Sequence, residues 1–149
     1  MSKTIFFHTE EIDFQLKKKK KVRNWLTELA KTEDKIIEEL NYIFCSDEYL
    51  LEVNKEHLDH DYFTDVITFD YCENNVISGD IFISIDRVKE NAKSFGKSFK
   101  NELRRVMAHG LLHLMGYKDK NEADETEMRK MEDFALKLRI KLKKQHIKY

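Results

Sequence analysis

The feature that most restricts the possible folds of this chain is its shortage of proline and glycine, the residues that interrupt regular structure. Its 149 residues include no proline and four glycines, Gly79, Gly96, Gly110 and Gly116. Glycine serves where the backbone turns sharply or where another group approaches it closely. We therefore expect each of the four to mark the end of an element or a tight contact.

Hydrophobic periodicity and runs of β-forming residues predict a mixture of strands and helices along the chain. Strands are expected at residues 4–8, 38–46, 64–71 and 79–85, and helices at residues 17–31, 47–58, 86–95, 100–115 and 122–144. Ser46 and Asp86 are the expected N-caps of the second and third helices, and Gly96 and Gly116 would end the third and fourth. This mixture, with strands clustered in the middle, favours an α+β fold, and we expect residues 1–149 to form a single domain.

Composition gives no indication of export, and the total charge does not identify a nucleic-acid-binding protein. The net charge is −1 at pH 7, so contact with RNA would rest on local basic segments, for which residues 17–21 and 137–149 are the candidates. For both segments, a solvated helix end is the favoured explanation. No apolar run approaches the about 20 residues that span a bilayer, and no signal-peptide core is present. We expect a cytoplasmic protein without membrane contact, with Cys45 and Cys72 as reduced thiols.

The segment MAHGLLHLMGYKDK, residues 107–120, contains the candidate metal-binding residues. His109 and His113 are four residues apart and share one face of a helix, which lets both imidazoles reach one metal ion. Two histidines in an apolar run can also be ordinary core residues. Asp119 follows the turn at Gly116, and two histidines with one carboxylate and a free position are typical of a catalytic zinc site. Gly110 stands where H-E-x-x-H metalloproteases have their glutamate base, so peptide hydrolysis by that base is not available.

Three segments resemble the YbeY family of endoribonucleases. HGLLHLMGYKDK is similar to the family signature H-G-x-L-H-L-x-G-Y-D-H. Residues 54–69 resemble N-x-x-Y-R-x-x-D-x-x-T-D-V-L-S-F, and residues 79–84 resemble the family's G-D-I strand. The resemblance covers residues 38–133. It implies a small mixed sheet packed among several helices, and a zincin-like site on a central helix with one zinc ion held by three histidines.

The resemblance also implies a function. The family's proteins are single-strand-specific, metal-dependent endoribonucleases that act in maturation of the 3′ end of small-subunit ribosomal RNA and in ribosome quality control. The implied partners are single-stranded ribosomal RNA and the small subunit or its proteins, and no contact with DNA is expected.

The chain departs from the family at two positions. The third family histidine aligns with Asp119, so the expected ligand set is His109, His113 and Asp119. Oxygen ligands also suit manganese or magnesium, so zinc is the expected ion with other divalent metals as alternatives. The family arginine aligns with Leu58, which cannot hold a phosphate. Its candidate substitutes are His57, His60, Lys118 and Lys120, for which surface charge is the simpler explanation.

Three further residues are candidates for the cleft. Asp65 stands just before a strand, where turn or cap residues are common. Thr68 either faces the cleft or is present only because threonine has a high β-strand propensity. Asp80 either orients a histidine, caps a strand end or contacts substrate.

The expected reaction is attack of a metal-activated water on a phosphodiester, with a general base that the sequence does not identify. Tyr62, Phe63 and Tyr117 are candidate platforms for stacking bases. Two alternatives remain at this point. One is a metal-dependent hydrolase of another class, and the other is a zinc-containing ribosome assembly factor without catalysis.

Overall fold

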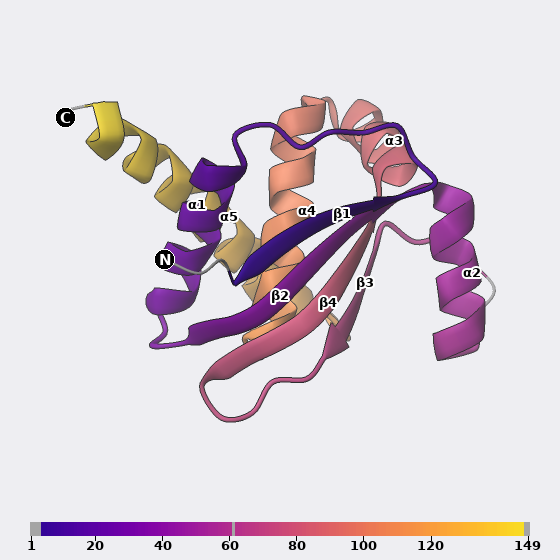
Figure 1. Ribbon diagram of the computed structural model, residues 1–149, viewed down its shortest axis with the longest axis horizontal. Coiled ribbons are helices and arrows are strands. Elements are labelled where there is room, and N and C mark those ends of the chain that lie inside the picture. Colours follow the sequence, from indigo (N-terminus) through magenta and orange to yellow (C-terminus); the bar gives the residue numbers. More distant parts are fainter. Residues whose placement is uncertain (1–3, 61, 148–149) are drawn as a thin grey trace.

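The computed structural model describes residues 4–60 and 62–147. Within these residues the chain contains the predicted mixture of strands and helices, and it ends with three consecutive helices (Figure 1). The elements are β1 (Ile5–Glu10), α1 (Lys19–Lys31), β2 (Ile36–Cys45), α2 (Asp47–Leu58), β3 (Val66–Asp70), β4 (Val76–Ser84), α3 (Ile85–Phe95), α4 (Phe99–Leu114) and α5 (Glu122–Ile147).

The four strands form one mixed sheet in the order β1-β2-β4-β3. β1 pairs with β2 and β2 with β4 in parallel, whereas β3 and β4 form an antiparallel hairpin. Parallel neighbours need a crossover connection, and α1 supplies it between β1 and β2. The expected α+β fold with a small mixed sheet is therefore confirmed.

One face of this sheet packs against the helices. Alternate residues of the two central strands are buried there, because side chains on a strand alternate between its faces. The buried residues on this face are Leu40, Tyr42, Phe44, Ile77, Ile81 and Ile83. The hydroxyl of Tyr42 donates a hydrogen bond of 2.8 Å to the carbonyl of Met107 in α4. This buried contact ties the central helix to the central strand.

Helix α4 lies unusually close to β4 because Gly110 has no side chain. A Cβ at this position would lie 2.7 Å from Cγ2 of Ile81. The apolar side of the helix is buried here, and Met107 and Leu111 are almost wholly inaccessible. His109 and His113 are consequently held at the margin of the contact between helix and sheet.

The opposite face of the sheet is covered only in part. Helix α2 packs there on a small cluster formed by Cys45, Leu50, Val53 and Ile67. Burial raises the pKa of the Cys45 thiol to about 12, so this cysteine stays protonated, as expected for a reduced core residue. Among the residues that the structure describes, no helix is both long enough and apolar enough to cross a membrane.

The N-cap predicted for the third helix was wrong. Ser84 has the extended backbone of a cap, and its hydroxyl accepts a hydrogen bond of 3.1 Å from the Arg87 amide. Asp86 lies already in the first turn of α3. Its carboxylate accepts a hydrogen bond of 2.9 Å from the Asp47 amide at the start of α2. The acidic side chain therefore serves the N-terminus of a different helix.

Candidate metal centre

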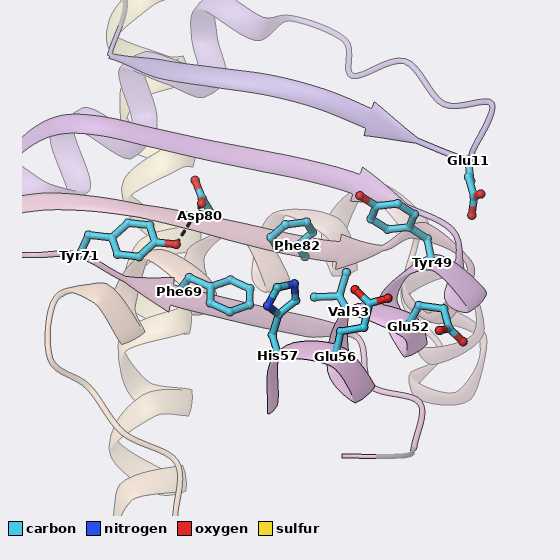
Figure 2. A pocket seen from close by; sticks show the side chains of 10 residues that line it. All are labelled: Glu11, Tyr49, Glu52, Val53, Glu56, His57, Phe69, Tyr71, Asp80 and Phe82. Atoms are coloured by element: carbon cyan, nitrogen blue, oxygen red, sulfur yellow. Dashed lines mark hydrogen bonds between the residues drawn. The ribbon is translucent and has the colours of Figure 1, made fainter. Parts of the chain in front are cut away.

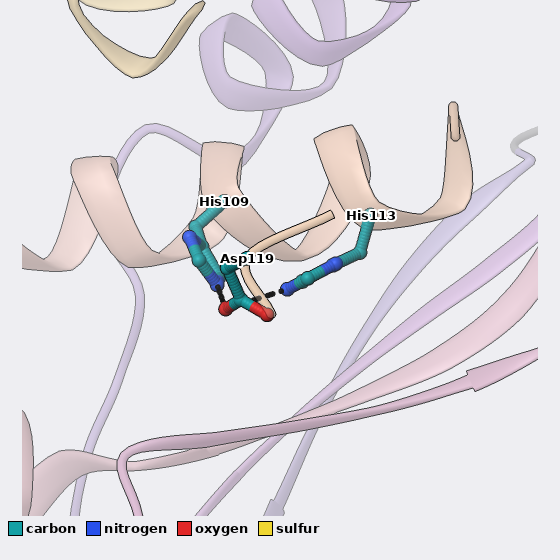
Figure 3. Close-up of side chains that lie close together, drawn as sticks. All are labelled: His109, His113 and Asp119. Atoms are coloured by element: carbon teal, nitrogen blue, oxygen red, sulfur yellow. Dashed lines mark hydrogen bonds and ion pairs between the residues drawn. The ribbon is translucent and has the colours of Figure 1, made fainter. Parts of the chain in front are cut away.

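His109, His113 and Asp119 lie together at the C-terminal end of α4 (Figure 3). Their candidate ligand atoms all lie within 4.8 Å of one another. Oδ2 of Asp119 is 3.3 Å from Nε2 of His109 and 3.2 Å from Nε2 of His113. Gly116 makes this convergence feasible, because its positive φ of 107° turns the chain back after the helix.

Hydrogen bonds at the far side of each imidazole set the direction of both rings. Nδ1 of His113 is 3.0 Å from the carbonyl oxygen of Tyr117, and Nδ1 of His109 is 2.7 Å from Oε2 of Glu132. A carbonyl and a carboxylate can only accept, so each Nδ1 donates its proton. In the neutral rings, the lone pairs of both Nε2 atoms therefore point toward Asp119. Two nitrogen ligands and one oxygen ligand, each imidazole anchored in this way, fit a divalent metal ion.

Glu132 is the residue of this site that the sequence analysis missed. It comes from α5, is 6% exposed, and its Oε1 accepts a hydrogen bond of 2.8 Å from Arg105. The same guanidinium also pairs with Asp133 at 2.7 Å. A signal was present in the sequence, because Glu132 lies four residues after Met128 and three before Ala135, on the apolar stripe of its helix. A charged residue at such a position needs a partner.

The site carries more negative than positive charge, and the pKa values reflect this balance. Burial by itself lowers the pKa of His109, but the nearby carboxylates of Glu132, Asp119 and Asp65 outweigh it and raise the pKa above its ordinary value. For Glu132, burial acts to raise the pKa, and hydrogen bonds from His109 and Arg105 outweigh this effect and lower it. Burial raises the pKa of Asp65. A divalent cation would neutralise this excess.

A cavity of about 570 Å³ opens beside His109 and Asp119. Its walls come from α4, the following loop and α5, and the residues that line it are His109, Asp119, Glu122, Glu125, Thr126, Met128, Arg129 and Glu132. Arg129 supplies a guanidinium here that the sequence analysis did not identify. Lys118 and Lys120 are exposed on either side of Asp119.

The three further cleft candidates lie in different places. Asp65 just precedes β3, close enough to His109 to influence its pKa. Thr68 shares a strand face with Val66, which packs against the main core, so it faces the α4 side of the sheet. Asp80 is on the other face, because its neighbours Gly79 and Ile81 face α4. The structure therefore does not bring Asp80 to the two histidines.

Asp80 belongs instead to a second cavity of about 540 Å³ (Figure 2). It accepts a hydrogen bond of 3.1 Å from Asn41, and the hydroxyl of Tyr71 lies 3.4 Å away. His57 lines the same cavity and packs edge-on against Phe69. His57 is consequently also separated from the two metal-site histidines by the sheet.

Comparison with known proteins agrees with this geometry. The family model described as endoribonuclease YbeY matches residues 4–139. An endoribonuclease YbeY from Cytophaga hutchinsonii is 57% identical over 137 residues, which cover 91% of this chain and 96% of that protein. Another from Flavobacterium psychrophilum is 53% identical over 128 residues, which cover 86% and 91%. The solution structure of a Thermotoga maritima protein matches with a TM-score of 0.68 at 27% identity, over 95% of this chain and 93% of that one. The chain therefore belongs to the endoribonuclease YbeY family.

Proposed function

We propose that this protein is a metal-dependent endoribonuclease that cleaves single-stranded RNA. The observation that carries the proposal is the convergence of two Nε2 atoms and one carboxylate oxygen, from His109, His113 and Asp119, in a member of a family named for RNA cleavage. Its place of action would be the cytoplasm. Its role would be maturation of the 3′ end of small-subunit ribosomal RNA and ribosome quality control, in contact with the small subunit or its proteins.

The three converging residues would hold one divalent cation, with zinc as the expected ion. When bound, the cation supplies Lewis-acid chemistry, which withdraws charge from a phosphodiester and makes a water molecule more acidic. Glu132 keeps the His109 ring in place, and the carbonyl of Tyr117 does the same for His113. The geometry of the donor atoms is therefore set before any ion or substrate arrives.

Phosphate groups would be held by cations of the same cavity. Arg129 lines it beside His109, and its planar guanidinium suits a phosphate oxygen pair. Lys118 and Lys120 flank Asp119 on the exposed loop. Together these three side chains would take over the electrostatic role of the family arginine, whose position is occupied by Leu58, an apolar and exposed residue.

Preference for single strands would follow from base stacking on exposed rings. Tyr62 and Phe63, between α2 and β3, are 56% and 49% exposed. Tyr117 is a weaker candidate because its hydroxyl donates a hydrogen bond of 2.7 Å to Glu33, which holds the ring in place. Asp65 and Thr68 remain candidates for the β3 side of the cleft.

The test compares the wild type with His113→Ala for cleavage of a labelled single-stranded RNA, with zinc, manganese or magnesium added to metal-free protein. We expect metal-dependent cleavage by the wild type and loss of it in the variant. Equal cleavage by both proteins would indicate a contaminating nuclease and would refute the proposal. Metal analysis of the purified proteins would show whether the variant has also lost its ion.

Two alternatives predict different results in the same experiment. A hydrolase of another class would cleave casein or a small ester and leave RNA intact. The position of Gly110 against Ile81 speaks against a peptidase, because a glutamate has no space there. An assembly factor without catalysis would retain the metal ion and bind RNA or the small subunit, but no cleavage would depend on His113.

A further inference from the structure

Two basic segments that are far apart in the sequence lie side by side in the fold. Helix α1 packs against α5, and the indole of Trp25 donates a hydrogen bond of 2.8 Å to the carbonyl of Ala135. Figure 1 shows the C-terminal half of α5 running past α1. Leu16, Val22, Leu138 and Leu142 pack into the main core in this region. The lysine run at the start of α1 and the basic end of α5 are thereby fixed to one surface.

Six cations gather at this surface, which we call the basic face. They come from the start of α1, the start of α4 and the second half of α5, and they are Lys18, Lys21, Lys100, Arg104, Arg139 and Lys143. The pKa of Lys18 is lowered by the charges of Lys21 and Lys143 and, to a lesser extent, by those of Lys100 and Arg104. The pKa of Arg104 is lowered by burial and by Arg139. Lys18 therefore lies near four of the other cations, and Arg104 lies near Arg139.

No carboxylate neutralises the basic face within residues 4–60 and 62–147. The ion pairs of this part of the chain involve other cations: Lys31, Lys55, Arg87, Arg105 and the two metal-site histidines. Arg104 and Arg139 are moreover partly buried. Unpaired, partly desolvated guanidinium groups next to exposed lysines are suited to binding an anion from outside the molecule.

The basic face is separate from the metal centre. Arg104 precedes His109 by five residues, which corresponds to a rotation of about 140° around the axis of α4, and Lys100 lies about 180° away. A ligand bound at the basic face therefore lies on a different side of the helix from the cleavage site. Only an extended anion could contact both.

We propose that the basic face binds the phosphate backbone of the RNA substrate outside the segment that is cleaved. The proposal rests on the proposed function, because it takes the extended anion to be the RNA that the metal centre cleaves. A membrane surface fits less well. An interfacial helix must present its apolar side to lipid, whereas Ala135, Leu138 and Leu142 of α5 pack against the core of the protein.

The test measures binding of the full-length protein to a labelled single-stranded RNA in EDTA, so that metal-dependent cleavage does not interfere. A basic-face variant combines Lys18→Gln, Lys100→Gln and Lys143→Gln, three exposed positions away from the metal centre. A scattered variant removes the same charge through Lys31→Gln, Lys93→Gln and Lys130→Gln, which are exposed on three different helices.

We expect the basic-face variant to show a shallower dependence of affinity on salt. Each lost contact with a phosphate of single-stranded RNA reduces the slope of log affinity against log salt by about 0.7, so three give about 2. The affinity at 0.1 M salt should then fall by up to about a hundredfold. The scattered variant should stay close to the wild type.

Two results would overturn the inference. One is an equal affinity and slope for the basic-face and scattered variants. The other is loss of binding to vesicles of phosphatidylserine and phosphatidylcholine in the basic-face variant without any loss of RNA binding. Failure of the proposed function gives a different result, because it appears as absence of His113-dependent cleavage whatever the binding data show.

Discussion

At the scale of single residues, the most informative contact is the one between Glu132 and His109. The carboxylate is buried, lies 2.7 Å from the imidazole and is itself held by Arg105. It fixes both the direction of the ring and the nitrogen that carries the proton. A candidate metal ligand on α4 thus depends on a residue of α5 that is 23 positions further along the chain.

We predict that Glu132→Gln weakens metal binding by about 10–100-fold, the range typical when a partner that orients a metal ligand is lost. The measurement is competition with a chromophoric chelator. Asp133→Asn is a matched control, because Asp133 also binds Arg105 but does not contact His109. Equal affinities for Glu132→Gln and the wild type would show that the ring needs no such support.

A second prediction concerns Asp65, whose pKa is raised above its ordinary value of 3.8 by burial. The folded protein therefore retains this proton to a higher pH than the unfolded chain, so the free energy of unfolding falls as pH rises between the two pKa values. Asp65→Asn removes this effect. The variant should gain stability relative to the wild type between about pH 3 and pH 7.

Urea unfolding of the metal-free proteins at both pH values measures this gain. Asp13→Asn, at an exposed carboxylate, serves as the control and should show a smaller change. A variant that loses stability relative to the wild type as pH rises would contradict the prediction. In that case the charge of Asp65 would be favourable in the folded state.

At the scale of elements, the helices and strands could be predicted because their signals are local. Ser46 caps α2 through a hydrogen bond to the Tyr49 amide, and Gly96 ends α3 in the left-handed conformation, as the sequence indicates. The Asp86 cap failed because a serine two residues earlier competes for the same role. The strand order and the separation of Asp80 from the histidines depend on contacts between distant segments, which local patterns do not contain.

The candidate site likewise has residues that local spacing predicts and residues whose position depends on tertiary packing. The pair His109 and His113 is readable from helical spacing, and the place of Asp119 from the turn at Gly116. Glu132 and Arg129 were missed, because the position of α5 over α4 depends on tertiary packing and not on spacing within a segment. The ligand roles of the first three residues stay predictions until a metal ion is measured.

The close packing of α4 on β4 leads to a third prediction. In Gly110→Ala, the new methyl group would meet Ile81 at 2.7 Å. Overpacking costs about 1–3 kcal/mol, and the better helix propensity of alanine returns about 1 kcal/mol. We expect a net loss of up to about 2 kcal/mol in urea unfolding, together with weaker metal binding because α4 carries both histidines.

Gly96→Ala separates these two effects. Its φ of 64° disfavours alanine, but a Cβ there would meet no atom within 4 Å. This variant should lose stability to a similar extent and keep its metal affinity. If Gly110→Ala also retained full affinity, the helix would adjust without moving its histidines.

At the scale of the whole molecule, a net charge of −1 conceals an uneven distribution. The basic face lies at one end, and the cavity on the open side of the sheet is lined by Glu11, Glu52, Glu56 and Asp80. That cavity would repel phosphate. The metal centre lies on a third surface, where carboxylates outnumber cations before an ion is bound.

We therefore predict that a divalent ion stabilises the entire fold. Binding to the folded state alone adds about 2.7 kcal/mol when the free ion is at 100 times its Kd. For a chain of this size, this corresponds to a rise in Tm of about 5–10 °C. Thermal unfolding of metal-free protein titrated with zinc measures the rise.

Asp119→Ala and His113→Ala should each lose most of this rise, whereas Asp124→Ala, in the first turn of α5, should keep it. A similar rise in all four proteins would place the ion elsewhere in the molecule.

The contact between Trp25 and Ala135 provides a means of observing the molecule. Trp25 is the chain's one tryptophan, is 2% exposed, and reports on the seating of α5 against α1. Its fluorescence should be blue-shifted in the native protein and should move to longer wavelength when α5 detaches. Because α5 also carries Glu132, tryptophan fluorescence can follow the support of the candidate metal centre by α5 without an added label.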